Sequence, residues 1–190
     1  MFDKMKWLNE APDWKINKGS LNVTTGNKTD FWRKNFYGFI RDDGHFFYHE
    51  VEGDFSAEVV FIGNYQELYD QAGLMLRVDE ENWVKTGIEF TDGNMHLSAV
   101  VTRDYSDWSV AAIDYNVQDE ITIRLTRHGD CVRIQYLDKN KKWNLLRLAY
   151  LDMPEECMIG VMCCSPERAG FEVEFKKFEV YEAISRKLHD

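Results

Sequence analysis

The stretch QAGLMLRVDEENWVKTGIEFTDGNMHLSAVVTR, residues 71–103, decides the fold. It contains three runs in which apolar and polar residues alternate, and this pattern is typical of antiparallel β-strands. We align the first two runs around the loop 79–82, with Leu76 opposite Val84, and the last two around a two-residue turn at Asp92-Gly93. Because side chains of a strand alternate between faces, this register assigns every residue to one side of the sheet.

One side of the three strands collects apolar residues and predicts the core of a β-sandwich. Its members are Leu74, Leu76, Val84, Ile88, Phe90, Leu97, Ala99 and Val101. Burying each large side chain contributes roughly 1.5 to 3 kcal/mol, which outweighs any single polar contact and supports this register.

The other side of the same strands has little bulk at its centre and polar groups around it. Its rows are Gly73, Gly87 and Ser98 in the centre, Met75, Lys85 and Val100 on one side, and Gln71, Glu89 and His96 on the other. Glycine inside a strand often marks a place where another group comes close. The rows predict a trough with polar walls, and the alternative is that the glycines lie at bulges or beneath an overlying loop.

The rest of the chain repeats this pattern of short alternating runs and turn signals. Asp43-Gly44 and Gly129-Asp130 are further candidates for hairpin turns, because they can supply the positive φ that such turns need. So many strands cannot remain one open sheet without strong curling. We therefore predict an all-β fold, a two-sheet antiparallel sandwich that occupies residues 1–190 as a single domain.

The segment TDFWRKNFYGFIRDDGHFFYHE, residues 29–50, places aromatic rings on both faces of a predicted hairpin. One core between two sheets cannot absorb all these rings, so some of them are expected on the outside of the sandwich, joined by Trp32 and Trp108. Aromatic surfaces beside amide and carboxylate groups are suited to holding sugar rings. The alternative is that the rings are core residues, as aromatic side chains more often are.

The composition excludes several classes of partner. A net charge of −10 and an isoelectric point near 5.0 oppose binding to nucleic acid or to an anionic membrane. We find neither a secretory signal nor a membrane-spanning stretch, so a cytoplasmic location is expected. The four cysteines have no zinc-ligand spacing, and His45 and His49 would lie about 13 Å apart on a strand. No metal and no cofactor are predicted.

Three segments carry a resemblance to a known family: TDFWRKNFYGFIRDDGHFFYHEVEGDF (29–55), YDQAGLMLRVDEENWVKTGIEF (69–90) and DWS (107–109). They resemble the bacterial and fungal family of unknown function that includes the fungal regulation-of-enolase protein. The resemblance implies a jelly roll similar to concanavalin A-like lectins and glucanases, which typically bind ligands on the concave sheet. It also implies motif positions, which are Asp30, Phe31, Trp32, Gly44, His45, Tyr69, Asp70, Gln71, Gly73, Trp83, Lys85, Gly87, Glu89 and Trp108.

Glu89 is the strongest candidate for acid or base chemistry, because the register puts Gln71 and His96 beside it. An ordinary surface pair is the alternative for Glu89 and His96. Glucanases of the resembled fold usually carry a Glu-x-Asp-x-Glu-like pattern on one strand, and this sequence has none. The carboxylate pair of a retaining glycosidase is therefore not evident.

The sequence thus predicts a non-catalytic binding module that holds a carbohydrate or another small polar ligand on the concave sheet. Two alternatives stay open: a glycan-active hydrolase that uses Glu89, and a regulatory partner of a metabolic enzyme. The predicted ligand-binding residues are Trp32, His45, Gln71, Gly73, Trp83, Lys85, Gly87, Glu89, Ser98 and Trp108.

Overall fold

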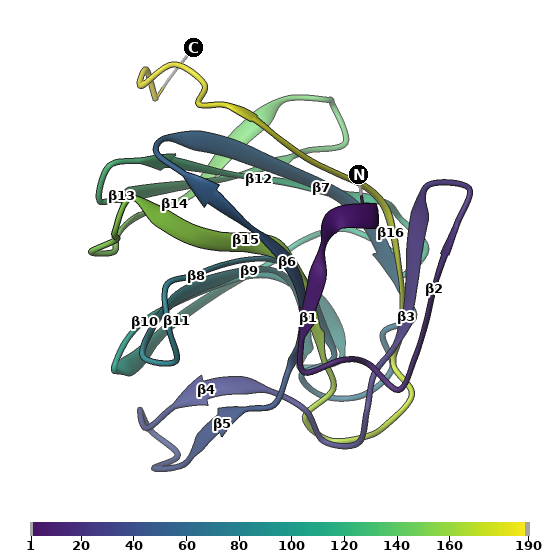
Figure 1. The fold of residues 1–190 in the computed structure, drawn as a ribbon. Helices are drawn as coiled ribbons and strands as arrows, with labels where there is room; N and C mark the ends of the chain where they lie inside the picture. The colour runs from purple at the N-terminus through teal and green to yellow at the C-terminus, as the bar shows by residue number, and fades with distance from the viewer. Residues whose placement is uncertain (1, 189–190) are drawn as a thin grey trace.

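A computed structural model describes residues 2–188 and consists almost entirely of antiparallel strands (Figure 1). A single 3-10 turn, η1, lies at the start of the described chain. The elements are η1 (Phe2–Lys4), β1 (Lys6–Leu8), β2 (Asp13–Asn17), β3 (Ser20–Thr24), β4 (Phe31–Arg33), β5 (Ile40–Asp42), β6 (His45–Glu52), β7 (Phe55–Gly63), β8 (Gln71–Arg77), β9 (Asn82–Thr91), β10 (Asn94–Arg103), β11 (Tyr105–Ala112), β12 (Ile121–His128), β13 (Cys131–Leu137), β14 (Trp143–Tyr150), β15 (Glu156–Cys164) and β16 (Glu172–Glu182). Between residues 2 and 188, no helix is long and apolar enough to cross a membrane.

The strands form two stacked sheets and one small separate pair. We call the sheet with the order β1-β6-β15-β8-β9-β10-β11 the front sheet, and the sheet with the order β14-β13-β12-β7-β16-β3-β2 the back sheet. The remaining pair, β4 and β5, lies beneath β8 and β9 on the side away from the back sheet (Figure 1). We call residues 31–42, which contain this pair, the flap.

The register predicted for β8, β9 and β10 is confirmed. Leu76 pairs with Val84, Gly73 with Gly87, and the pairing continues across the sheet as the alternation requires. Asp92 and Gly93 both have positive φ, as a two-residue turn between β9 and β10 demands. Local sequence therefore fixes which face each of these side chains takes.

The core between the two sheets contains the apolar side that the sequence predicted. Leu76, Val84 and Ile88 are completely buried in it. The adjacent residues Cys163 and Cys164 on β15 point to opposite faces, one into this core and the other into a second cluster under the flap. The front sheet is thus covered by the back sheet on one face and by the flap on part of the other face.

The hairpin predicted around Asp43-Gly44 is wrong. Strand β5 pairs with β4 in the flap, whereas β6 pairs with β1 and β15. Gly44 does not have positive φ; a Cβ there would lie within 2.6 Å of atoms of Phe31 and Cys164. This glycine permits close packing between the flap and the front sheet, so a turn signal and a packing signal look the same in the sequence. The hairpin at Gly129 is confirmed, with a φ of +63°.

Candidate functional site

The flap closes over part of the outer face of the front sheet and creates a second hydrophobic core. Phe31 from the flap packs with Trp83, with ring centroids 6.2 Å apart. The buried members of this core are Phe31, Trp32, Phe46, Met75, Trp83, Val100, Met162 and Cys164. The aromatic stretch of residues 29–50 is therefore divided between two cores, and other rings remain on the surface. Phe36 at the flap tip is 91% exposed.

The glycine row is occupied by the protein's own backbone. A Cβ on Gly73 would lie 2.1 Å from the backbone oxygen of Thr86, and a Cβ on Gly87 would lie 1.9 Å from the backbone oxygen of Ala72. These glycines allow β8 and β9 to approach each other closely. The predicted open trough above them is wrong, since the flap fills the neighbouring row and neither glycine lines a cavity.

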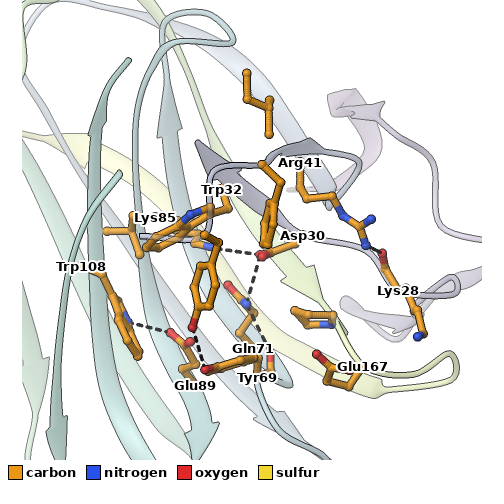
Figure 2. Close-up of a pocket in the computed structure, with 15 residues that line it drawn as sticks. Lys28, Asp30, Trp32, Arg41, Tyr69, Gln71, Lys85, Glu89, Trp108 and Glu167 are labelled. Atoms are coloured by element: carbon orange, nitrogen blue, oxygen red, sulfur yellow. Dashed lines mark hydrogen bonds and ion pairs between the residues drawn. The ribbon is translucent and has the colours of Figure 1, made fainter. Parts of the chain in front are cut away.

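A cavity of about 610 Å³ opens next to the filled part of this face, between the flap, β8 to β11 and the segment after β15 (Figure 2). Its volume lies within the range of small-molecule sites, which is about 300 to 1,000 Å³. The residues lining it are Lys28, Asp30, Trp32, Tyr37, Phe39, Ile40, Arg41, Tyr69, Gln71, Lys85, Glu89, Val100, Trp108, Pro166 and Glu167. Aromatic and charged side chains thus share one concave surface.

Asp30, which directly precedes the flap, forms a buried ion pair with Lys85 on the floor of the cavity. The Nζ atom of Lys85 donates to Oδ1 of Asp30 at 3.0 Å and to the backbone oxygen of Phe31 at 2.7 Å. Burial alone would lower the pKa of Lys85. Electrostatic attraction, chiefly from Asp30, outweighs burial and raises the pKa above its ordinary value. Gln71 also donates to Oδ1 of Asp30. Figure 2 shows these side chains converging on Asp30.

Glu89 lies buried beside this ion pair. Its Oε2 atom accepts hydrogen bonds from the hydroxyl of Ser98 at 2.7 Å and from the indole of Trp108 at 3.1 Å. Within residues 2–188, no hydrogen bond reaches its second oxygen, Oε1. Burial raises the pKa of Glu89, against the opposing effect of Lys85. The site therefore holds a carboxyl group that is protonated more readily than an exposed glutamate and that has a free acceptor oxygen.

Aromatic rings form the walls around Glu89 at steep angles to one another. Trp32 and Trp108 meet at 88° with centroids 6.4 Å apart, and Tyr69 meets Trp108 at 80° and 6.3 Å. Tyr37 from the flap contacts Trp32 at 5.7 Å and shares a hydrogen bond of 3.0 Å with the hydroxyl of Tyr69. That bond, together with burial, raises the pKa of Tyr69 to about 12. Tyr69 stays a neutral phenol at physiological pH.

Five of the predicted site residues line the cavity, and the others do not. Those that line it are Trp32, Gln71, Lys85, Glu89 and Trp108. Trp83 is completely buried in the second core. His45 is buried elsewhere, where Nε2 accepts from the backbone nitrogen of Gly26 and Nδ1 lies 2.7 Å from the backbone oxygen of Asn9. Ser98 does not line the cavity; its hydroxyl donates to Glu89 at 2.7 Å and accepts from the indole of Trp108 at 3.2 Å.

His96 does not complete an acid–base pair with Glu89. It pairs with Glu89 across the strands as predicted, yet its ring nitrogen lies 3.1 Å from the backbone oxygen of Asn94 and it does not line the cavity. Cross-strand partners on adjacent strands can share a face without touching when their side chains lean differently. Between residues 2 and 188, we also find no group of His, Cys, Asp and Glu that could hold a metal ion.

Sequence reasoning missed the residues that reach the cavity from outside the front sheet. Asp30 and Tyr69 were named only as family motif positions. The others are Lys28, Tyr37, Phe39, Ile40, Arg41, Pro166 and Glu167, whereas Val100 lies on β10 opposite Lys85, as the register predicted. The excess of rings in residues 29–50 was the one local signal for Tyr37 and Phe39. Pro166 and Glu167 follow β15, and no short-range pattern connects them to the flap.

Comparisons with known proteins place the chain in a family. Residues 7–183 match the family described as "Protein of unknown function (DUF1349)". The chain is 41% identical over 184 residues to Regulation of enolase protein 1 of Saccharomyces cerevisiae, across 97% of this chain and 92% of the relative. A crystal structure of a functionally unknown protein from Saccharomyces cerevisiae has a TM-score of 0.92 and 39% identity, covering 97% of this chain and 99% of that one.

More distant structures share the fold. A xylan beta-1,4-xylosidase from Bacillus halodurans has a TM-score of 0.69 at 11% identity, and the likeness covers 95% of this chain and 38% of the enzyme. The carbohydrate-binding module CBM66 from Bacillus subtilis has a TM-score of 0.53 at 15% identity, over 82% of this chain and 93% of the module. The predicted two-sheet jelly-roll sandwich is confirmed. Because the family match extends over most of the sequence, the chain belongs to the DUF1349 family of proteins of unknown function.

Proposed function

We propose that the protein is a non-catalytic binding protein that holds a carbohydrate or another small polar ligand in the cavity between the flap and the front sheet. The observation that carries this proposal is a cavity of about 610 Å³ in which the walls are aromatic rings and the floor holds Glu89 with one free oxygen. Rings of this kind stack on the C–H face of a sugar, while carboxylate and amide oxygens accept from its hydroxyls. The shared fold of the Bacillus subtilis carbohydrate-binding module supports the same ligand class.

Trp108→Ala is expected to lower the affinity for the ligand about tenfold, because each aromatic contact contributes about 0.5 to 1.5 kcal/mol beyond its buried area. The ligand is first identified as a thermal shift in a screen of mono- and oligosaccharides and polar metabolites, and calorimetry then gives the affinity of each variant. Trp143→Ala is the matched control, since Trp143 stacks on Arg124 in the back sheet, 3.9 Å from the guanidinium. A screen without any binder, or equal losses in the two variants, would contradict the proposal.

A glycan-active hydrolase is the second candidate, favoured by the raised pKa of the buried Glu89 carboxyl. Retaining glycosidases need a second carboxylate about 5 Å away as nucleophile. Two other carboxylates line this cavity within residues 2–188. Asp30 accepts hydrogen bonds from Lys85, Gln71 and the backbone N–H of Phe31, and Glu167 is exposed at the rim. Hydrolysis of a chromogenic glycoside that Glu89→Gln abolishes would decide for the hydrolase.

Regulation of enolase is a third candidate, since the Saccharomyces cerevisiae relative that bears this name is 41% identical along nearly the whole chain. The exposed flap tip with Phe36 would be the surface available to such a partner. The test is enolase activity measured with and without an excess of this protein, with Phe36→Ser as the variant expected to lose any effect.

A further inference from the structure

We propose that the inner part of the cavity selects a ligand that carries an ammonium group beside its hydroxyls, such as an amino sugar, over neutral and anionic ligands of the same shape. The inference rests on the proposed binding function and specifies the charge of the ligand. Three features of the cavity support it: the arrangement of its aromatic rings, the hydrogen bonds that its donors and acceptors already make, and the distribution of its charges.

The rings enclose a corner instead of forming a single stack. Trp32, Trp108 and Tyr69 each meet a neighbour at 80° or more, and Tyr37 closes the arrangement from the flap. All four rings line the same cavity (Figure 2). A cation placed within about 6 Å of several ring centres is attracted by the negative face of each ring, and aromatic cages for ammonium groups use this geometry.

The hydrogen-bond donors at the floor are largely satisfied by the protein itself. The amide of Gln71 donates to Asp30 and to the backbone oxygen of Tyr69, and Lys85 donates to Asp30 and Phe31. The indole nitrogens are also engaged, that of Trp32 by the backbone oxygen of Asn35 and that of Trp108 by Glu89. The hydroxyl pair of Tyr37 and Tyr69 retains one O–H that is not used between them.

The acceptors at the floor are left open. Among the described residues, no hydrogen bond reaches Oε1 of Glu89, Oε1 of Gln71 or Oδ2 of Asp30. A ligand that fits this pattern must bring hydrogen-bond donors, and an ammonium group brings three together with a positive charge. Such a group would pair with Glu89 in a charge-assisted hydrogen bond inside a partly desolvated site.

Uncompensated negative charge lies at the floor of the cavity, and positive charge lies at its rim. The carboxylate of Asp30 is already compensated by Lys85, so Glu89 is the charge at the floor without a cation of its own. The cations Lys28 and Arg41 lie at the rim, where Arg41 donates to the backbone oxygen of Lys28 and is 3.8 Å from Asp43. An anionic ligand would meet these two cations at the rim, whereas the floor cation Lys85 is already engaged by Asp30 and by the backbone oxygen of Phe31. The net charge of −10 further favours the approach of cations.

The test uses sugars that differ in charge but not in ring shape, namely glucosamine, glucose and glucuronate. Choline and its neutral isostere 3,3-dimethylbutan-1-ol form a second pair without a sugar ring. Binding is followed by NMR through the indole N–H signal of Trp108 in isotopically labelled protein near neutral pH. We expect the ammonium member of each set to bind at least about tenfold more tightly than its neutral counterpart.

Glu89→Gln should remove this preference while leaving the melting temperature close to that of the parent, because glutamine retains an oxygen for Ser98 and Trp108. Glu167→Gln, the same exchange on the exposed rim of the same cavity, should keep the preference. Preferential binding of glucose or glucuronate, absence of binding by both ammonium probes, or a preference that survives Glu89→Gln would overturn the inference. The proposed binding function would fall as well only if the wider screen found no ligand of any charge.

The affinity for the ammonium probes should also depend on pH. Glu89 is faced by Lys85 from its own strand, His96 from β10, Asp30 from the segment before β4 and Tyr69 from the segment before β8. Its pKa is raised, so protonation removes the negative charge at a higher pH than for an exposed glutamate. Affinity should fall as the pH drops through this raised pKa, and Glu89→Gln should give a flat profile over the same interval. A flat profile in the parent protein would contradict the pairing of Glu89 with the ligand.

Discussion

Lys85→Met is expected to lower the free energy of unfolding by about 3 to 5 kcal/mol, the usual cost of removing one partner from a buried ion pair. Its ammonium lies under the flap, 3.0 Å from Asp30 and 2.7 Å from the backbone oxygen of Phe31. Methionine fills a similar volume but leaves the carboxylate of Asp30 without its cation. Urea denaturation with constant m-value measures the loss.

The flap should loosen first in this variant, since Lys85 is one of the buried cations that connect this region to the front sheet. Two further connections remain, Arg77 to Asp42 at 2.7 Å and Arg33 of the flap to Glu81 at 2.8 Å. Hydrogen exchange of the flap amides should therefore accelerate before that of β12 or β7. Lys6→Met is the control, because Lys6 forms a solvent-exposed pair with Glu50 that contributes little to stability. Similar losses in the two lysine variants would contradict a structural role for the Asp30–Lys85 pair.

Gly87→Ala should be the most damaging single-methyl addition in the front sheet, with a loss of about 3 kcal/mol or more. The added Cβ would lie 1.9 Å from the backbone oxygen of Ala72 and 2.8 Å from the Cα of Gly73. Both neighbours belong to the backbone of β8, so no side-chain rotation relieves the overlap, and the strands must separate. Circular dichroism melts of the purified variant measure the effect.

Gly26→Ala provides the matched control for this change. Gly26 has no positive φ, and its Cβ would meet side-chain atoms at 3.4 Å and beyond, which is ordinary contact. A glycine-to-alanine change at a compatible site typically alters stability by about 0.4 to 1 kcal/mol through the unfolded chain. If Gly87→Ala melted as close to the parent as Gly26→Ala, the tight approach of β8 and β9 would not be a constraint on this fold.

Much of the front sheet could be predicted from residues 71–103. The alternation of Leu74, Leu76, Val84 and Ile88 has a period of two, and the Asp92-Gly93 turn fixes the offset between β9 and β10. Both signals are local, so they survive without knowledge of the rest of the chain. They placed Glu89, Lys85 and Gln71 together on one face, and the cavity contains all three.

The same signals could not tell which part of that face remains open. Trp83 shares the face with Glu89, yet it is buried under the flap, whereas Glu89 borders the cavity. The difference depends on where residues 31–42 dock, through contacts such as Asp30 to Lys85, which are 55 positions apart. Glycine adds a further ambiguity, because Gly44 and Gly87 serve close packing while Gly93 serves a turn.

The sequence by itself determined strands β8 to β10 of the front sheet, their register and the face on which each of their side chains lies, because these follow from short-range alternation and turn geometry. Only the tertiary structure decided that the flap covers the middle of the outer face and leaves a cavity beside Glu89. That choice is made by contacts between segments far apart in the chain, and a pattern with a period of two residues contains no information about what packs above it.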